Sequence, residues 1–526
     1  MVNRLIVADG IRTASGRPGD AVLIKNGVID TIGRVEDLRG PGVTEERFTG
    51  HFIAPGLVDA HFHPLGYAAA LLRLNVAEAR SMTDLGDLIR AAEDGLRPGE
   101  SLIGTRLDDQ AIGRLPTRHD LDGMVDGRPV LIYRYCGHVA VANTAALEIA
   151  GIASATADPA GGLLDRDDDG RPTGVLRETA IALVAGAVGG RTEGLEPGEL
   201  LTAMHGLASL GLTSLGAIID LGGDLWCGVG NELDLLTEIG PDLPLRASVL
   251  VTADDPRTLE AAAARLSSAG PLVGFLGVKQ FADGSFGGHT AAMNAPFSDL
   301  DTRGTLRIDE GTARMARAAL AMGGRVAVHA IGDRANSAVL DLFEALIDEG
   351  ADPTDLRIEH ASVLTLPDVH RMSSLGVTAV VQPAFLMSEV EWLEDRLGAD
   401  RMDRTYAFRS LLEAGVPLAG SSDCPVEPPS PWWGMAAARD RAGLTPAEQL
   451  TGAEAFALFT TGAAAAVGSP PLDPGHPADL AIVDRDPVEV TTEQLRSTRV
   501  AATLINGERV LVPPDPVVWR AGSAAS

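Results

Sequence analysis

The sequence contains few cysteines, and its basic residues are fewer than its acidic ones. The three cysteines, Cys136, Cys227 and Cys424, lie far apart and form no C-x-x-C pair, which argues against a disulfide framework and favours a reducing compartment. Lys and Arg total 43 against 72 Asp and Glu, a formal net charge of −29. This charge disfavours nucleic acid and anionic membranes as partners. We therefore expect a small-molecule substrate, with a homodimer as an open alternative to a monomer.

Long hydrophobic runs are also missing. No apolar stretch reaches membrane-spanning length, and the first residues, MVNRLIVADGIRTASG, lack the hydrophobic segment of a signal peptide. These absences favour a cytoplasmic protein. The 526 residues, 45% of them hydrophobic, are enough for a large core and more than one domain.

The middle of the chain alternates between apolar runs and helical stretches. Ala/Leu-rich segments with helical period separate most of the runs. The run that ends at His63 is the first, and seven more read as buried strands: 211–218, 245–251, 273–281, 324–333, 356–362, 376–385 and 416–425. Eight strand–helix units in series predict an α/β fold with a (β/α)₈ TIM-like barrel over residues 56–465.

Two other parts of the chain depart from this repeat. Residues 76–205 are far too long for a simple crossover between the first two strands, so we expect an inserted, lid-like subdomain over the barrel mouth. Both chain ends are rich in short β-type runs, and each contains an Asn-Gly hairpin signal. We predict that residues 1–55 and 466–526 combine into one small β-sandwich domain.

The segment GLVDAHFHP places two histidines at the end of the first predicted strand. His61 and His63 are two residues apart, so both side chains point to one face while Phe62 points to the other. Two converging neutral imidazoles can share a metal ion such as zinc. The motif alone is weak, because a strand that happens to carry polar groups explains it equally well.

Other predicted strands also end in polar residues. Active sites of such barrels lie at the carboxyl ends of the strands, where this sequence has Lys279, His329, His360 and Asp423. Each has an ordinary explanation: a surface lysine, core histidines, a helix cap. Six such residues at equivalent positions instead predict one site for one or two divalent metal ions, and the ligand types favour Zn²⁺.

This ligand set suggests a mechanism. The apolar FLGV run before Lys279 predicts a desolvated amine, which can react with CO₂ to form a carbamate (N6-carboxylation) that bridges two cations. His61, His63 and Asp423 would hold one metal, and His329 and His360 the other. A bridging water would become hydroxide near neutral pH. We predict Asp423 as general base and acid, with Lys279 as the second catalytic residue.

This set of residues resembles the amidohydrolase superfamily. The chain is similar to its YtcJ-like branch (amidohydrolase family 3), which includes N-substituted formamide deformylases. The similar stretches include GLVDAHFHP, GHVAVANTAAL, VKQFADGSFGGHTAAM, HAIGD, IEHA and GSSDCPV. The resemblance implies a (β/α)₈ barrel, a composite β-sandwich from both termini and metal-dependent hydrolysis of amide-type bonds. His289, where Arg is expected, and Phe297, where Tyr is frequent, depart from it at positions that bear on substrate contacts.

The predicted function is metal-dependent hydrolysis of an amide-type C–N bond in an N-formyl, N-acyl or cyclic amide. Two alternatives use the same site: a non-hydrolytic decarboxylase or lyase, and a deaminase. A non-enzymatic assembly protein on this scaffold would have lost metal ligands, and this sequence retains all six. Sequence patterns do not separate hydrolysis from decarboxylation.

Four residues are predicted to contact substrate. His138, within the insertion, is also a candidate catalytic residue. Asp283 and His289 follow the lysine strand, and Trp432 follows the last strand. Each has a structural alternative: a turn for His138 and Asp283, packing on the barrel for Trp432. Surface or packing roles are assigned to His51, His119, His205, His370 and His476.

Overall fold

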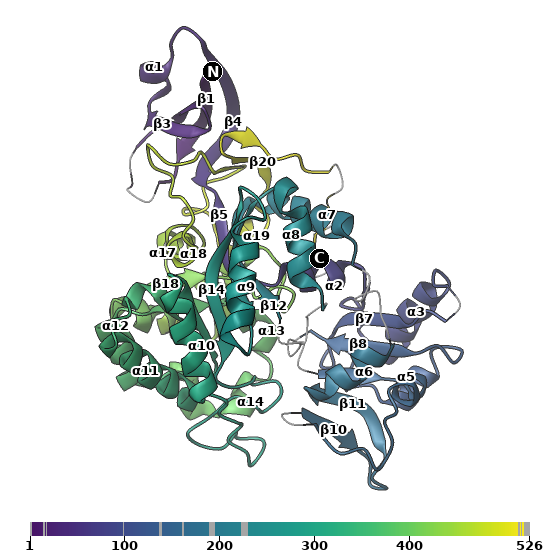
Figure 1. Ribbon diagram of the computed structural model, residues 1–526. Coiled ribbons are helices and arrows are strands. Elements are labelled where there is room, and N and C mark those ends of the chain that lie inside the picture. Colours follow the sequence, from purple (N-terminus) through teal and green to yellow (C-terminus); the bar gives the residue numbers. More distant parts are fainter. Residues whose placement is uncertain are drawn as a thin grey trace.

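Three β-sheets organise the chain in the computed structural model (Figure 1). A parallel barrel lies at the centre, a sheet built from both chain ends lies beyond one end of it, and the insertion lies to its side. The structure describes residues 3–13, 16, 18–97, 99–135, 139–159, 162–188, 195–221, 230–513, 516, 518 and 519. None of the described helices is both long and apolar enough to span a bilayer.

The eight strands of the barrel are those predicted. They are β5 (Leu57–Phe62), β12 (Leu212–Asp220), β13 (Arg246–Thr252), β14 (Val273–Phe281), β15 (Arg325–Ala330), β16 (Leu356–His360), β17 (Thr378–Val381) and β18 (Leu418–Gly420). All neighbours in this order pair in parallel. A bridge between Phe62 and Cys424 joins the first strand to the loop after the last. The predicted (β/α)₈ architecture is confirmed.

Helices cover the outside of the barrel, and the longer ones pack on it through an apolar face. In α11 (Asp333–Asp348), Ala335, Val339, Phe343 and Leu346 are buried at helical spacing. The others are α2 (Pro64–Leu71), α7 (Pro197–Leu207), α8 (Glu232–Ile239), α9 (Pro256–Leu266), α10 (Glu310–Ala321), α12 (Leu366–Leu375), α15 (Phe408–Glu413), α16 (Pro431–Asp440) and α17 (Gly452–Ala457). Two short helices, α13 (Phe385–Glu389) and α14 (Leu393–Leu397), follow β17.

Apolar side chains fill the amino-terminal end of the barrel. Val58, Ile218, Leu250 and Val380 belong to one buried cluster with residues of α18 (Ala463–Val467), which packs against β5 and β18. This packing closes one end of the barrel and leaves its polar residues at the carboxyl end. The strand ends are therefore the place where a site can form.

The two chain ends share one sheet of seven strands. Its order is β21-β20-β19-β4-β1-β2-β3. The strands are β1 (Asn3–Ile11), β2 (Ala21–Lys25), β3 (Val28–Gly33), β4 (Val43–Pro55), β19 (Leu480–Val483), β20 (Val500–Ile505) and β21 (Glu508–Arg509). Asn26 and Gly27 have positive φ between β2 and β3, as the hairpin signal requires. Because β4 leads through Gly56 into β5, the first barrel strand extends a strand of the terminal sheet.

The insertion has a sheet of its own, with order β10-β11-β9-β8-β7-β6. The strands are β6 (Leu74–Asn75), β7 (Leu102–Leu107), β8 (Val130–Arg134), β9 (Val139–Ala142), β10 (Gly162–Arg166) and β11 (Pro172–Glu178). The helices are α3 (Met82–Glu93), α4 (Arg118–Asp122), α5 (Thr144–Ile149) and α6 (Ala180–Val188). Helix α7 begins within the predicted range 76–205 and ends two residues beyond it, and it packs against α2 and α8 of the barrel.

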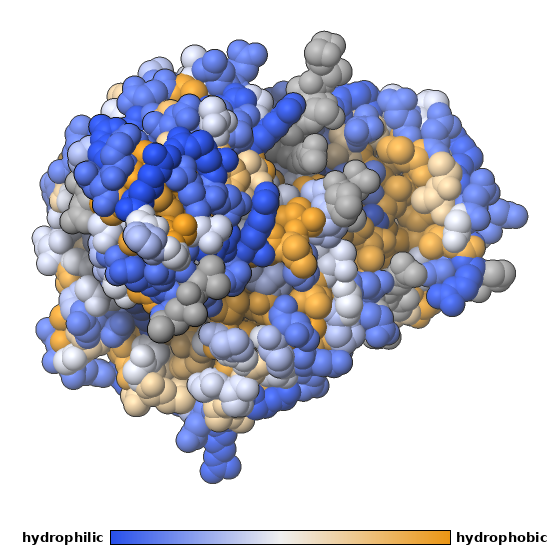
Figure 2. Space-filling view, turned by 90° about the horizontal axis from the view of Figure 1, so that it is seen from above, coloured by the Kyte–Doolittle hydropathy of each residue, from blue (hydrophilic) through white to orange (hydrophobic). Residues whose placement is uncertain are grey.

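A cavity of about 230 Å³ lies where the insertion meets the barrel, lined by residues of α2, α3 and β7. Figure 2 shows apolar surface gathered on the insertion side of the molecule. The insertion also contacts the barrel mouth directly, because the Tyr135 hydroxyl donates to the Ser388 carbonyl and accepts from Trp392 Nε1.

Candidate metal centre

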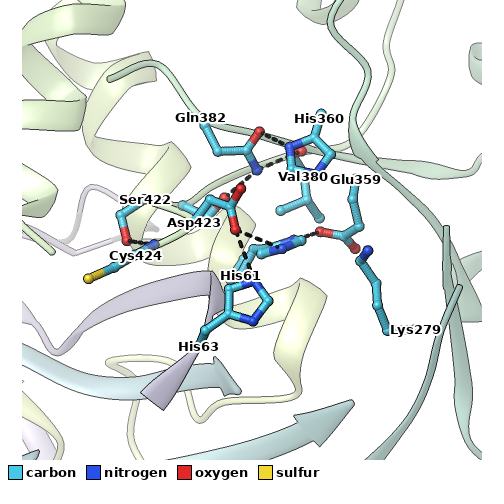
Figure 3. Close-up of polar contacts among 12 residues, drawn as sticks. His61, His63, Lys279, Glu359, His360, Val380, Gln382, Ser422, Asp423 and Cys424 are labelled. Atoms are coloured by element: carbon cyan, nitrogen blue, oxygen red, sulfur yellow. Dashed lines mark hydrogen bonds and ion pairs between the residues drawn. The ribbon is translucent and has the colours of Figure 1, made fainter. Parts of the chain in front are cut away.

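The six predicted metal ligands lie at the carboxyl ends of the barrel strands, and all are buried. His61 is the second-last residue of β5, and His63 follows that strand directly. Lys279 lies on β14, His329 on β15 and His360 at the end of β16, while Asp423 follows β18. Figure 3 shows that side chains from distant parts of the sequence converge on Asp423.

Three of these residues form a compact group. His61, His360 and Asp423 each present a ligand atom within 4.8 Å of the other two. Asp423 Oδ1 lies 3.1 Å from Nε2 of His61 and 3.1 Å from Nε2 of His63. Two or three imidazoles and a carboxylate are a donor set that suits Zn²⁺. The residues present therefore fit a divalent cation.

His329 and Lys279 lie beside this group. The His329 ring centroid is 4.4 Å from that of His360, but its Nε2 lies 2.9 Å from the Gly284 carbonyl oxygen. Lys279 Nζ sits 3.6 Å from the centroid of the Phe281 ring. Burial lowers the pKa of Lys279 to about 8, against the opposing charges of Glu359 and Asp423. The structure thus places a readily deprotonated amine next to the three-residue group.

Backbone conformation explains how two of the ligands reach the centre. His360 and Asp423 have φ of 73° and 56°, in the left-handed region. This conformation is uncommon for residues other than glycine and is frequent at functional sites. At His360, the last residue of β16, it breaks the regular alternation of the strand, whereas Asp423 lies in the loop after β18. Asp59 secures the loop around Asp423, because its carboxylate accepts from the Ser422 hydroxyl at 2.5 Å.

Two residues that the sequence patterns did not single out orient the imidazoles. His61 Nδ1 donates to Glu359 Oε2 at 2.5 Å, and His360 Nδ1 donates to Gln382 Oε1 at 2.8 Å. Burial opposes ionisation of Glu359, but the Arg357 guanidinium and His61 hold its pKa well below the usual range. Because each Nδ1 carries the proton, each Nε2 is available to a metal. The only sequence signal was the position of Glu359 directly before His360.

Comparison with known proteins identifies the family. The sequence model of the amidohydrolase family matches residues 49–511, most of the chain. The chain belongs to the amidohydrolase family. The resemblance inferred from its motifs is confirmed, and the protein is a hydrolase.

Similar proteins match this amidohydrolase over nearly its whole length. YtcJ of Bacillus subtilis (strain 168), named as an amidohydrolase, is 32% identical over 93% of this chain and 96% of its own. N-substituted formamide deformylase of Arthrobacter pascens is 27% identical over 96% and 98%, respectively. Among solved structures, a metal-dependent hydrolase from Pyrococcus horikoshii OT3 has a TM-score of 0.73 and 28% identity, covering 93% of this chain and 99% of its own.

Glu359 gives a test of how the amidohydrolase positions its ligands. Glu359→Gln is expected to weaken binding of a divalent metal by about 10- to 100-fold, because a neutral amide holds the Nδ1 proton of His61 less strongly than a carboxylate does. Competition with a chromophoric chelator measures the affinity. Glu349→Gln, on an exposed ion pair with Arg317, is the matched control. Equal metal affinities for the two variants would show that Glu359 does not contribute to metal binding.

Asp283, predicted to contact substrate, accepts hydrogen bonds from the backbone, and its Oδ1 lies 3.4 Å from Nε2 of His329. Its carboxylate accepts from the N–H groups of Ala292 and Gly332 at 2.8 Å and of Ile331 at 3.0 Å. These bonds fasten the loop after β14 to the end of β15. Burial nevertheless raises the pKa of Asp283 to about 7. The arrangement favours a structural role for this residue.

Removal of this carboxylate is expected to destabilise the amidohydrolase. Asp283→Ala should lower the free energy of unfolding by about 3–5 kcal/mol, because three buried N–H groups lose their acceptor. Asp283→Asn should lose less, since one amide oxygen can still accept from Ala292 and Gly332. Urea denaturation ranks the variants. A loss below about 1 kcal/mol for Asp283→Ala would contradict the structural role.

The other predicted substrate contacts lie in different surroundings. Trp432 is buried and donates Nε1 to the Leu210 carbonyl oxygen at 3.0 Å, which favours packing on the barrel. His289 is half-buried, with Nε2 3.0 Å from Asp299 Oδ1 and its ring edge-on to Phe297. His138 lies outside the described residues.

Proposed function

We propose that this amidohydrolase cleaves an amide-type C–N bond in a small N-formyl, N-acyl or cyclic amide. The observation that carries the proposal is the compact group of His61, His360 and Asp423 at the barrel mouth. The printed name of the Arthrobacter pascens relative, an N-substituted formamide deformylase, supports the choice of amide-type bond.

The chain's own residues supply binding and proton transfer. A bound Zn²⁺ would polarise the substrate carbonyl and lower the pKa of water. Burial opposes ionisation of Asp423, but His61 and His63 hold the pKa of its carboxyl well below the usual range. Asp423 is therefore ionised at neutral pH, and its Oδ2 can take the proton of the attacking water and return it to the leaving nitrogen.

The remaining ligands extend this proposal. We place His63 with the group around Asp423, and His329 at a second position beside His360. Lys279, with its lowered pKa, is proposed to be carboxylated and to bridge the two positions. Protein with one metal would have Lys279 as a free amine.

Metal analysis combined with a product screen tests the proposed function. We expect one or two equivalents of zinc per chain, loss of activity on chelation and recovery on adding zinc. Screening N-formyl, N-acyl and cyclic amides should reveal the released amine and acid. Protein with less than about a tenth of an equivalent of metal, and no activity on adding metal, would contradict the proposal.

A further inference from the structure

Two acidic residues that the proposed chemistry does not use lie close to the metal centre. Glu389 is the last residue of α13, one helical turn after Phe385, and residues i and i+4 share a helix face. The Phe385 ring stacks on His360, with centroids 6.0 Å apart and planes 16° apart. Glu427 lies four residues after Asp423, in the loop that leads to α16. The charge of Asp423 acts on Glu427, and that of Glu427 acts on Glu389. The two carboxylates therefore lie in the neighbourhood of the group shown in Figure 3.

Glu427 is buried, and its hydrogen-bonding capacity is not fully used. Its exposed fraction is 6%, and its Oε1 has no hydrogen-bond partner within the described part of the chain. Burial raises the pKa of Glu427 to about 7, and the charge of Asp423 adds to this, whereas a hydrogen bond with the Ser388 side chain opposes it. The unpartnered atom is therefore one oxygen, Oε1, and not the whole carboxyl group. A buried carboxylate oxygen without a donor is costly. Such a group is explained when a ligand supplies the donor.

The neighbouring charges favour a cationic ligand. Glu389 accepts from the Tyr406 hydroxyl at 2.5 Å. Burial, together with the charge of Glu427, raises the pKa of Glu389 to about 7. A cation bound near the two carboxylates would reduce their mutual repulsion and stabilise the ionised form of each.

The arginines near Glu427 and Glu389 interact with other residues. Arg134 pairs with Asp109, and Arg396 with Asp299, each at 2.7 Å. Arg106 lies over the Trp519 ring, 5.3 Å from its centroid, with φ of 66° on β7. The positive charge of Arg106 opposes the rise in the pKa of Glu427, but no ion pair joins the two described side chains within 4.0 Å.

We propose that Glu427, with Glu389 beside it, determines substrate specificity by binding a cationic nitrogen, an ammonium or guanidinium, near the scissile amide. The inference rests on the proposed function, since it names the class of amide substrate that the enzyme prefers. A charge-assisted hydrogen bond between Glu427 Oε1 and the substrate nitrogen satisfies the unpaired oxygen. Alkyl amides without a cation would leave it unpaired.

Matched substrates test the proposal: N-formyl-n-butylamine and its counterpart with a terminal amine, N-formyl-1,4-diaminobutane. Zinc-loaded wild-type enzyme is expected to prefer the amino substrate by at least about tenfold in kcat/KM. Glu427→Gln should lower this ratio by about 10- to 100-fold, mainly through KM. Glu391→Gln, an exposed position two residues after Glu389, is the control and should keep the wild-type ratio.

The outcomes separate this inference from the proposed function. If neither substrate nor any other amide screened is hydrolysed, the proposed function is wrong. Equal hydrolysis of both by wild type, or an unchanged ratio in Glu427→Gln, would overturn the specificity role while the hydrolase stands. Equal losses on both substrates with a lower melting temperature would also overturn it, by making Glu427 structural. Should Glu427→Gln fail to fold, Glu389→Gln and inhibition of wild type by 1,4-diaminobutane, compared with 1-butanol, decide the question.

Discussion

Asp423→Asn is expected to lower kcat by about 10²-fold or more while most of the bound zinc remains. An asparagine oxygen can still face His61 and His63, which lie 3.1 Å from Asp423 Oδ1. The amide cannot accept a proton, so turnover should fall further than metal content. Steady-state kinetics and elemental analysis of the same preparation measure both effects.

A control separates proton transfer from a general loss of charge. Asp341 lies on α11 and forms an exposed ion pair with Arg371 of α12. Asp341→Asn removes this acidic group and should leave turnover unchanged. If Asp423→Asn kept near-wild-type turnover with metal bound, Asp423 would be only a ligand or a cap. If it lost metal and activity in equal proportion, its role as base would be unsupported.

If Lys279 forms the proposed carbamate bridge, Lys279→Ala is expected to lose one metal ion and to reduce activity by about 10²-fold or more, since the bridge would supply several kcal/mol of charge stabilisation. The side chain is 1% exposed, and burial lowers its pKa to about 8, so a neutral amine is available to CO₂. A small carboxylic acid, such as acetate, has two oxygens and can occupy the vacated space. Added acetate should therefore restore part of both metal content and activity.

Lys279→Met provides the comparison, because it fills the space without supplying an amine. Methionine should lose metal and activity as alanine does, but acetate should rescue it poorly. Suppose that wild-type protein has a single, fully occupied metal site and that acetate does not rescue Lys279→Ala. Lys279 would then be a free ammonium. The bridging mechanism would then be wrong, and the hydrolase assignment would stand.

The barrel was predictable from sequence because its signals are local. A short apolar run followed by a helix with one apolar face recurs along the chain, and all eight runs became strands of one sheet. The extent of the insertion was harder to predict. Helix α7 has the same periodicity whichever domain it belongs to, and only its contacts with α2 and α8 place it on the barrel.

The polar residues that converge at the strand ends could also be predicted, whereas the residues around them could not. Alternation along a strand places Glu359 and His360 on opposite faces, but the left-handed φ of His360 brings both to the centre. Gln382 and Glu427 are ordinary polar residues in sequence. Their roles depend on partners from other strands and helices, which no local pattern specifies.

The terminal sheet has a consequence for synthesis of the protein in cells. β4 continues into the strand that carries His61, and its partner β19 lies near the opposite end of the chain. At about 5–20 residues per second, ribosomes need about 20–90 s between these two strands. During that time β4 has an unpaired edge, which is a template for aggregation. We therefore expect the nascent chain to need chaperones that cover this edge until β19 has been synthesised.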